Sequence, residues 1–240
     1  MPASRVTFVQ TCDLVARDAP WPFADQHAAE IDVHWARRAA ENPAYFNGRI
    51  YMLASHAIRN GALTGQLIPV DFKAFLYWRE TGQRDTSVCD VFGSAIIRSH
   101  DGAILLGRQR AGNLNAGLVY LPGGFIDARD VDGAGEVDIR ASVLREVEEE
   151  TGLAARTLAV SEGFLVTTVG QQVSVAVEFV ADGEAKHVLA AMRRTLAGDA
   201  ASELEEIVAV RDVDDLDGLP MPIYADALLR YLLGARPAPR

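Results

Sequence analysis

The chain has 240 residues, of which 49% are hydrophobic and 23% charged, a composition typical of a soluble globular protein with a sizeable core. Its formal net charge of -10 disfavours a general nucleic-acid or anionic-membrane binder, because either partner requires a basic face. No apolar stretch is long enough to span a bilayer, and Cys12 and Cys89 form no paired motif. We therefore expect a cytoplasmic protein without membrane or nucleic-acid partners.

The first third of the chain predicts a small α/β unit. The expected strands are 6–10, 49–58 and 63–70, and helical spacing relates Ala28, Ile31, Trp35 and Ala39 and, further on, Phe72, Phe75, Leu76 and Trp78. Asn60-Gly61 is a two-residue turn signal between the later strands, and Asp71 can cap the second helix. The polar run 81–85 marks a boundary, so we expect an N-terminal unit over residues 1–88.

From Cys89 onward the pattern changes, and a second domain is expected over residues 89–240. Its expected strands are 91–99, 103–107, 118–121, 158–169, 173–180 and 207–210, and its expected helices are about 139–151, 185–196 and 223–233. Asp138 is placed to cap the first of these helices. Mixed strands and helices put the chain in the α+β class.

The segment Arg145-Glu146-Val147-Glu148-Glu149-Glu150-Thr151-Gly152-Leu153 breaks the ordinary rules of helix composition. It follows Leu121-Pro122-Gly123-Gly124 and crowds acids into the last turns of a helix. A helix C-terminus already carries partial negative charge, and like charges four residues apart repel. Because such local conflicts are typical of functional sites, we interpret the cluster as a magnesium site in which manganese can substitute.

Projected at about 100° per residue, the helix separates its core side from its carboxylates. The core side carries Val143, Leu144, Val147 and Thr151. Glu146, Glu149 and Glu150 gather at the edge of that side, whereas Glu148 points away and is expected to be solvated. Three converging carboxylates offer the hard oxygen ligands that magnesium prefers. The alternative is an amphipathic helix with a merely solvated acidic face.

Two further residues complete the predicted metal site. Arg145 lies one turn before Glu149 and can hold that carboxylate in orientation. Gly124 has no Cβ, so its backbone can approach a ligand and present a carbonyl oxygen to the metal.

At these residues the chain resembles the Nudix hydrolase superfamily. The family pattern Arg-Glu-apolar-x-Glu-Glu-x-Gly-apolar is matched by residues 145–153, and the opening glycine of the family's box corresponds to Gly124. The resemblance covers about residues 89–220. It implies an α/β/α sandwich with a mixed β-sheet, here joined to a small N-terminal α/β extension, and magnesium-dependent cleavage of a diphosphate linked to another moiety. By the same resemblance Glu146, Glu149 and Glu150 are metal ligands, Glu146 is also a candidate base, and Arg145 supports them.

The box departs from the family's usual spacing. Residues 125–135 lie between Gly124 and Glu136, and Val137 occupies the position where the family places its early glutamate. The role of Glu136 is therefore open. The insert carries Asp127, Asp130 and Asp132, and we expect it to form its own loop over the site.

Charged residues outside the box are further candidates. Many family members add an acid from a later loop, and Glu203, Glu205 and Glu206 precede an expected strand; we take Glu203 as the metal ligand. Arg108 and Arg110 follow another strand and can pair with a substrate phosphate. The alternatives are a solvated acidic loop and solvent-facing arginines.

The N-terminal unit gives the substrate prediction. Residues 35–38 and 42–51 are similar to the amino-terminal region of Nudix proteins that hydrolyse UDP-glucose. This similarity favours a nucleoside diphosphate sugar, split into a nucleoside monophosphate and a sugar 1-phosphate. ADP-ribose, dinucleotides and coenzyme A compete with it, and a sensor that binds such metabolites without cleaving them is the alternative from another class.

The aromatic residues Trp35, Tyr45 and Phe46 are expected mainly to pack the core of the N-terminal unit, although an exposed aromatic could stack on a base. Base specificity, the phosphorus attacked and the oligomeric state stay open, with a homodimer allowed for.

Overall fold

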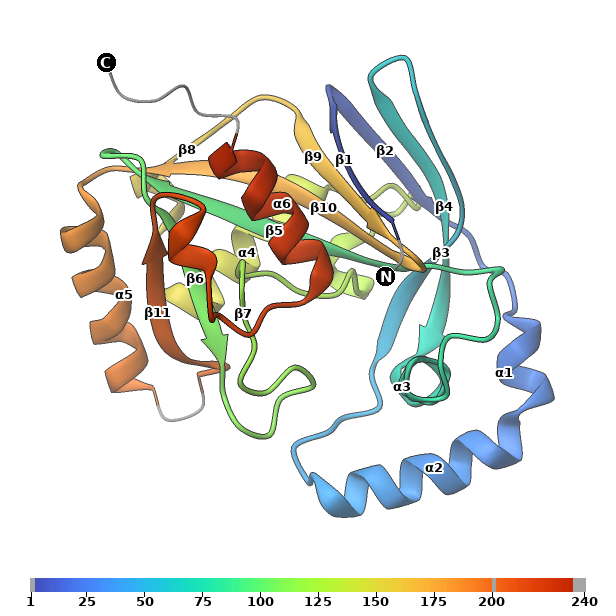
Figure 1. The fold of residues 1–240 in the computed structure, drawn as a ribbon. Helices are drawn as coiled ribbons and strands as arrows, with labels where there is room; N and C mark the ends of the chain where they lie inside the picture. The colour runs from blue at the N-terminus through green and yellow to red at the C-terminus, as the bar shows by residue number, and fades with distance from the viewer. Residues whose placement is uncertain (1–2, 200–201, 235–240) are drawn as a thin grey trace.

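A computed structural model describes residues 3–199 and 202–234, and its larger part is a mixed β-sheet with helices on both faces (Figure 1). The strands follow the order β1 (Ser4–Val9), β9 (Phe164–Val169), β10 (Gln172–Ala181), β5 (Asp90–Ser99), β6 (Ile104–Gln109) and β11 (Leu204–Val210). In addition, β7 (Val119–Tyr120) pairs with β6, and β8 (Leu158–Val160) pairs with β10. The central pair, β5 and β10, runs parallel over its whole length.

Alternation of side chains along the central strands builds one core on each face of this sheet. Ala95 and Ile97 of β5 join the core beneath α4 (Ile139–Thr151) and α5 (Ala185–Gly198). Ile96 points the other way, into the core beneath α6 (Ile223–Gly234). In Figure 1, α6 lies in front of the sheet and α4 behind it. The architecture is an α/β/α sandwich around a mixed sheet, which confirms the expected α+β class.

The expected strand at 158–169 is divided. Its first part is β8 and its second part is β9, with a break between them at residues 161–163. Gly163 adopts a positive φ of 70°, and a Cβ there would lie 2.3 Å from the ring of Phe8. The chain therefore turns at this glycine, and β8 and β9 pair with different parts of β10.

The N-terminal unit has a smaller sheet in the order β2 (Thr11–Ala16), β4 (Ala62–Asp71) and β3 (Arg49–Arg59). The helices of this unit are α1 (Pro22–Gln26), α2 (Ala28–Glu41) and α3 (Phe72–Glu80), whose Phe75 and Trp78 are fully buried. Asn60 and Gly61 both have positive φ, 51° and 75°, which confirms the two-residue turn between β3 and β4. The sequence patterns did not predict β2 or α1.

Asp71 occupies the N-cap position of α3, but within the described residues its side chain makes no capping hydrogen bond. The cap comes from the loop that follows α2. Asn47 accepts a hydrogen bond from the Lys73 amide at 2.8 Å, and the Gly48 carbonyl accepts one from the Phe72 amide at 2.9 Å. The expected role of Asp71 was therefore wrong, because a distant Asn-Gly pair satisfies the free amides of this helix.

The segment between Gly124 and α4 joins the two sheets through backbone hydrogen bonds. The Tyr51 amide of β3 donates to the Ile126 carbonyl at 2.9 Å, and the Ala16 amide donates to the Gly135 carbonyl at 2.7 Å. β1 also pairs with β9 in the large sheet although it precedes β2 in the chain. The boundary between residues 88 and 89 stays a prediction. In residues 3–199 and 202–234, no helix combines the length and apolar character needed to cross a bilayer.

Candidate active site

The acidic helix α4 has the bounds that its sequence predicted. The Asp138 carboxylate accepts hydrogen bonds from the amides of Arg140 and Ala141 at 3.0 and 3.1 Å, and Gly152 ends the helix with a φ of 71°. Val143 and Val147 are buried against the sheet, whereas Glu148 is exposed on the opposite side. The predicted division of this helix into a core side and a solvated side is therefore confirmed.

The Gly123-Gly124 turn brings backbone against both the central strand and α4. A Cβ on Gly123, whose φ is 153°, would lie 2.2 Å from the Gly93 carbonyl oxygen. A Cβ on Gly124 would lie 2.7 Å from Oε2 of Glu146. The Gly124 carbonyl accepts a hydrogen bond from the Gly93 amide at 3.0 Å. A carbonyl oxygen has two lone pairs, so this hydrogen bond leaves one of them available for a metal ion. The metal contact of Gly124 stays a prediction.

Three carboxylates face one another beside this turn. Glu150 is 5% exposed, and its Oε2 accepts a hydrogen bond from the Gly123 amide at 3.0 Å. Burial raises the pKa of Glu150 well above its usual value, and repulsion from Glu203 and Glu146 adds to this effect. Burial also raises the pKa of Glu146, and partial desolvation at the surface raises that of Glu203. The site therefore concentrates negative charge where water solvates it poorly.

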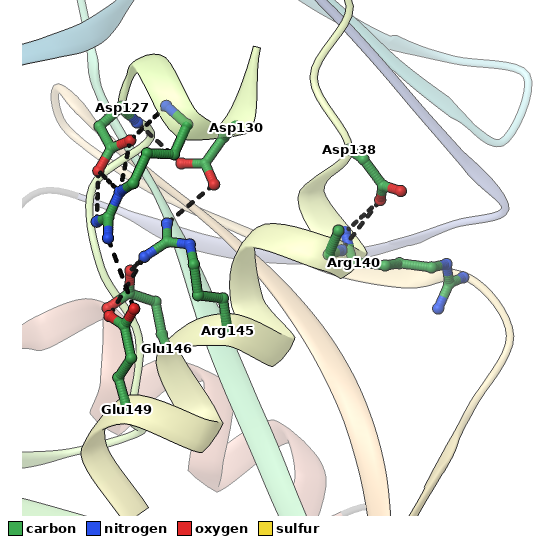
Figure 2. A network of polar contacts seen from close by, with 9 residues as sticks. Asp127, Asp130, Asp138, Arg140, Arg145, Glu146 and Glu149 are labelled. Atoms are coloured by element: carbon green, nitrogen blue, oxygen red, sulfur yellow. Dashed lines mark hydrogen bonds and ion pairs between the residues drawn. The ribbon is translucent and has the colours of Figure 1, made fainter. Parts of the chain in front are cut away.

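Figure 2 shows Arg145 between Asp130 and the carboxylates of Glu146 and Glu149. Arg145 Nη1 donates to Glu146 at 2.6 Å and to Glu149 at 3.4 Å, while its Nη2 donates to Asp130 at 2.9 Å. Arg129 pairs with Asp127 at 2.7 Å and lies 3.5 Å from Glu149. The predicted contact between Arg145 and Glu149 is thus present, although the shorter contacts of Arg145 are with Glu146 and Asp130.

Asp130 is the residue of this network whose role the sequence patterns did not assign. Its side chain is 2% exposed, and its other oxygen accepts a hydrogen bond from the Asp127 amide at 2.9 Å. Asp127 and Asp130 form a capping box around the 3₁₀ turn η1 (Ala128–Asp130). In the sequence, the only sign of this capping box is the spacing of Asp127 and Asp130, which are acidic residues three positions apart.

A cleft of about 870 Å³ lies over these groups. Its floor includes Gly123, Gly124, Glu146, Glu150 and Glu203. The N-terminal unit contributes a second wall to the same cleft, with residues Ala44, Tyr45, Phe46, Gly48, Arg49, Ile50, Phe72 and Arg79. The N-terminal unit therefore helps to enclose whatever binds above the carboxylates.

Phe46 is 81% exposed at this wall, so the expectation that it packs into the core of the N-terminal unit was wrong. The backbone explains its position, because Asn47 and Gly48 are held against the start of α3 and the preceding residue is turned outward. Trp35 and Tyr45 are half-buried, and their ring centroids lie 6.3 and 5.9 Å from that of Phe72 in edge-to-face arrangements, so they pack at the margin of the N-terminal core and not within it.

Residues 90–228 match the family model described as the NUDIX domain, which is more than half of the chain. The chain belongs to the Nudix family. As a member of this family it is a hydrolase that acts on diphosphate bonds. The chain matches none of the curated proteins with which it was compared.

Several solved structures are similar to this chain. The MutT protein from Methanosarcina mazei is 23% identical with a TM-score of 0.41, and the match covers 59% of this chain and 91% of that one. DR0079 from Deinococcus radiodurans is 11% identical with a TM-score of 0.46, covering 77% and 99%. A bifunctional NMN adenylyltransferase/ADP ribose pyrophosphatase from Francisella tularensis is 17% identical with a TM-score of 0.44, covering 67% and 45%.

The donor groups of this Nudix site suit a divalent cation. Carboxylates with raised pKa values lie together at Glu146, Glu150 and Glu203, and a cation would offset both their burial and their mutual repulsion. Within residues 3–199 and 202–234, no three His, Cys, Asp or Glu side chains are already grouped as a metal cage. Glu149 in particular is 51% exposed and is turned toward Arg129 and Arg145.

The two arginines predicted to bind phosphate, Arg108 and Arg110, are not among the residues that line the cleft. Arg108 donates to Glu206 at 2.7 Å and to the Gly117 carbonyl at 3.2 Å. Arg110 donates to the carbonyls of Ser202 and Leu204 at 2.7 and 3.1 Å, which fixes the start of β11. These contacts favour structural roles, and phosphate binding by either arginine stays a prediction.

Gly124→Ala is expected to inactivate the Nudix site while the protein stays folded. The new methyl group meets the end of a flexible side chain, so the Glu146 carboxylate can move away and relieve the overlap. A displacement of about 1 Å in a catalytic group can cost roughly 100-fold in rate, which is the loss of kcat/KM expected here. Gly133→Ala is the matched control, because a Cβ there meets no atom within 4 Å. Equal activity of both variants in steady-state assays would contradict this account.

The cleft also holds a second buried carboxylate, Asp90, which is 5% exposed. Burial raises its pKa from 3.8 to about 6, against the lowering effects of the Arg79 charge and a hydrogen bond from Gln172. A raised pKa in the folded state stabilises the protein below pH 3.8, and this contribution is lost as the pH rises through about 6.

Asp90→Asn is therefore expected to be more stable than the wild type at pH 7.5, by up to roughly 3 kcal/mol for a shift of about two pKa units. The difference should shrink at pH 4.5, because the wild-type carboxyl is then mostly protonated. Urea unfolding of both proteins at the two pH values measures this. A stability difference that does not change with pH would show that Asp90 does not titrate in this range.

Proposed function

We propose that this Nudix protein is a magnesium-dependent pyrophosphohydrolase that cleaves a nucleoside diphosphate sugar into a nucleoside monophosphate and a sugar 1-phosphate. The observation that carries the proposal is the carboxylate cluster of Glu146, the buried Glu150 and Glu203 on the floor of a cleft with two walls. Manganese is expected to replace magnesium, since both prefer oxygen ligands.

The residues have separate tasks in the proposed reaction. Divalent ions held by Glu146, Glu149, Glu150 and Glu203 would neutralise charge on the diphosphate and lower the pKa of a bound water. Glu146 is the candidate base, because it lines the cleft and burial raises the pKa of its carboxyl, which makes it a stronger proton acceptor. Arg145 fixes the orientation of the Glu146 carboxylate through its 2.6 Å contact.

The second wall of the cleft supports a substrate with a sizeable group on each side of the diphosphate. About 870 Å³ is within the range of pockets that enclose whole small molecules. The exposed ring of Phe46 offers a flat surface on which a base can stack. The similarity of residues 35–38 and 42–51 to UDP-glucose hydrolases points to uridine as the base.

A substrate screen with product masses tests the proposal. UDP-glucose, ADP-ribose, diadenosine polyphosphates, NADH and coenzyme A are each incubated with the protein and Mg²⁺, and parallel samples contain Mn²⁺ or EDTA. We expect uridine monophosphate and glucose 1-phosphate to form fastest, and only with a divalent ion. Tight binding of a nucleotide without any product would instead indicate a sensor. ¹⁸O-water then identifies the phosphorus that is attacked. A cytoplasmic location and a homodimer stay predictions.

A further inference from the structure

The cleft also contains polar groups that the proposed chemistry does not use. Asp90 and Gln172 are direct partners across the parallel pair β5–β10, and both line the cleft. Side chains at paired positions of neighbouring strands lie on the same face of the sheet. Arg79 reaches this place from α3 of the N-terminal unit and supplies the opposite charge to Asp90.

Hydrogen bonds fix the surroundings of these three residues. Arg79 Nη2 donates to Asn115 Oδ1 at 2.5 Å, and Asn115 Nδ2 donates to the Tyr120 hydroxyl at 3.0 Å. Tyr120 packs near Tyr224, whose ring meets that of Phe92 edge-on at 4.8 Å between centroids. The result is a pocket with polar groups between aromatic faces, built by the large sheet, α6 and, from the N-terminal unit, α3.

Burial of Asp90 is costly for the fold, because a carboxylate shielded from water needs compensating partners. An ionised carboxylate can accept about four hydrogen bonds. Gln172 is a hydrogen-bond partner, and the raised pKa shows that Arg79 and Gln172 together offset only part of the cost. Asp90 lines the cleft, so acceptor positions that these partners do not take are suited to a ligand that donates hydrogen bonds.

We propose that Asp90, Arg79 and Gln172 form a subsite for the hydroxyl groups of the sugar that the substrate carries on its second phosphate. Asp90 accepts from the hydroxyls, and Arg79 and Gln172 donate to them. The inference rests on the proposed pyrophosphohydrolase activity and assigns the sugar half of its substrate.

The chemistry of the pocket favours a sugar over a nucleobase. A hexose presents adjacent hydroxyls that both donate and accept, and the combination of a carboxylate, an amide and a guanidinium complements them. A base is planar, and the exposed ring of Phe46, which also lines the cleft, suits it better. The same cleft contains the reactive centre, since Gly123, whose amide donates to Glu150, lines it together with Asp90 and Tyr120.

Two substrates that differ only in the sugar test the subsite: UDP-glucose and the methyl ester of UDP, which has the same diphosphate and no hexose. We expect the wild type to cleave UDP-glucose with a kcat/KM at least roughly tenfold higher, and Asp90→Asn to remove most of that advantage through KM. Asp226→Asn is the matched control, because Asp226 is a half-buried aspartate paired with Arg230 on α6. Equal loss on both substrates, or no wild-type preference, would overturn the subsite. Failure of the wild type to cleave either substrate with Mg²⁺ would count against the proposed function itself.

A binding measurement separates the subsite from catalysis. Saturation-transfer NMR with glucose 1-phosphate and the wild-type protein is expected to show contact with the ring protons, and Gln172→Met is expected to reduce it. Methionine keeps the length of the glutamine side chain, so this variant also serves if Asp90→Asn fails to fold. Absence of saturation transfer in the wild type would overturn the assignment of a sugar to this pocket.

Discussion

Glu150→Gln is expected to lower turnover by about 10²–10⁴-fold, because several kcal/mol of transition-state stabilisation depend on a charged ligand at this position. The amide keeps an oxygen that can accept from the Gly123 amide, so the local backbone should stay in place. Glu148→Gln is the matched control on the same helix, since Glu148 is exposed on the opposite side. Steady-state rates with the best substrate and Mg²⁺ measure the difference. Similar rates for the two variants would rule out the carboxylate cluster as the catalytic centre.

The same change is expected to stabilise the metal-free protein. Burial and repulsion from Glu203 and Glu146 make the ionised form of Glu150 unfavourable in the folded state, and a neutral amide removes this cost. A gain of about 1 kcal/mol raises the Tm of a domain of this size by about 2–4 °C. Thermal unfolding in EDTA should therefore give a higher Tm for Glu150→Gln than for the wild type. Added Mg²⁺ should then stabilise the wild type more than the variant.

A lower turnover together with a higher Tm for Glu150→Gln would be stronger evidence that the carboxylate cluster is the active site than either result alone. A residue needed only for the fold lowers both when it is replaced. A group that destabilises the folded protein and is still required for turnover is typical of a site shaped for a ligand.

The acidic helix could be predicted accurately because its signals are local. A capping aspartate, a helical repeat of apolar residues and a terminal glycine all lie within residues 138–152, and the structure has each in its expected role. Sheet order and the pairing of β2 with β4 depend on contacts between segments about 50 residues apart, which local patterns do not carry.

The second wall of the cleft could not be predicted for the same reason. A polar segment separates Arg79 from Asp90 in the chain, and its composition predicts a domain boundary. In the structure, however, Arg79 of α3 and Asp90 of β5 line the same cleft. The insert gave a partial signal: its aspartates predicted a loop over the site, but not which of them holds Arg145. That choice depends on how the insert hydrogen-bonds to β2 and β3.

Asp130→Asn tests whether the insert positions the catalytic carboxylate. Asp130 is buried and holds Arg145 at 2.9 Å, and Arg145 in turn holds Glu146 at 2.6 Å. Without the Asp130 charge the guanidinium is free to move, and the Glu146 carboxylate loses its fixed orientation. Loss of such an indirect partner of a metal ligand typically costs about 10–100-fold in metal affinity or activity. We therefore expect kcat to fall by roughly that factor, with the KM for the substrate nearly unchanged.

A control in the same insert distinguishes positioning from loop folding. Asp132 accepts hydrogen bonds from the amides of Ala134 and Glu136, so Asp132→Asn changes an aspartate of this loop without touching Arg145. Asp130→Asn should also raise the Mg²⁺ concentration needed for half-maximal rate, whereas Asp132→Asn should not. Asp130→Glu keeps the charge and should recover part of the lost kcat. If Asp130→Asn and Asp132→Asn lower kcat equally, and Asp130→Glu recovers none of the lost kcat, the insert acts only by covering the cleft. If kcat falls only in Asp130→Asn, the insert is part of the active site. It then acts through the ion pair of Asp130 with Arg145, and backbone bridges hold it against the N-terminal sheet.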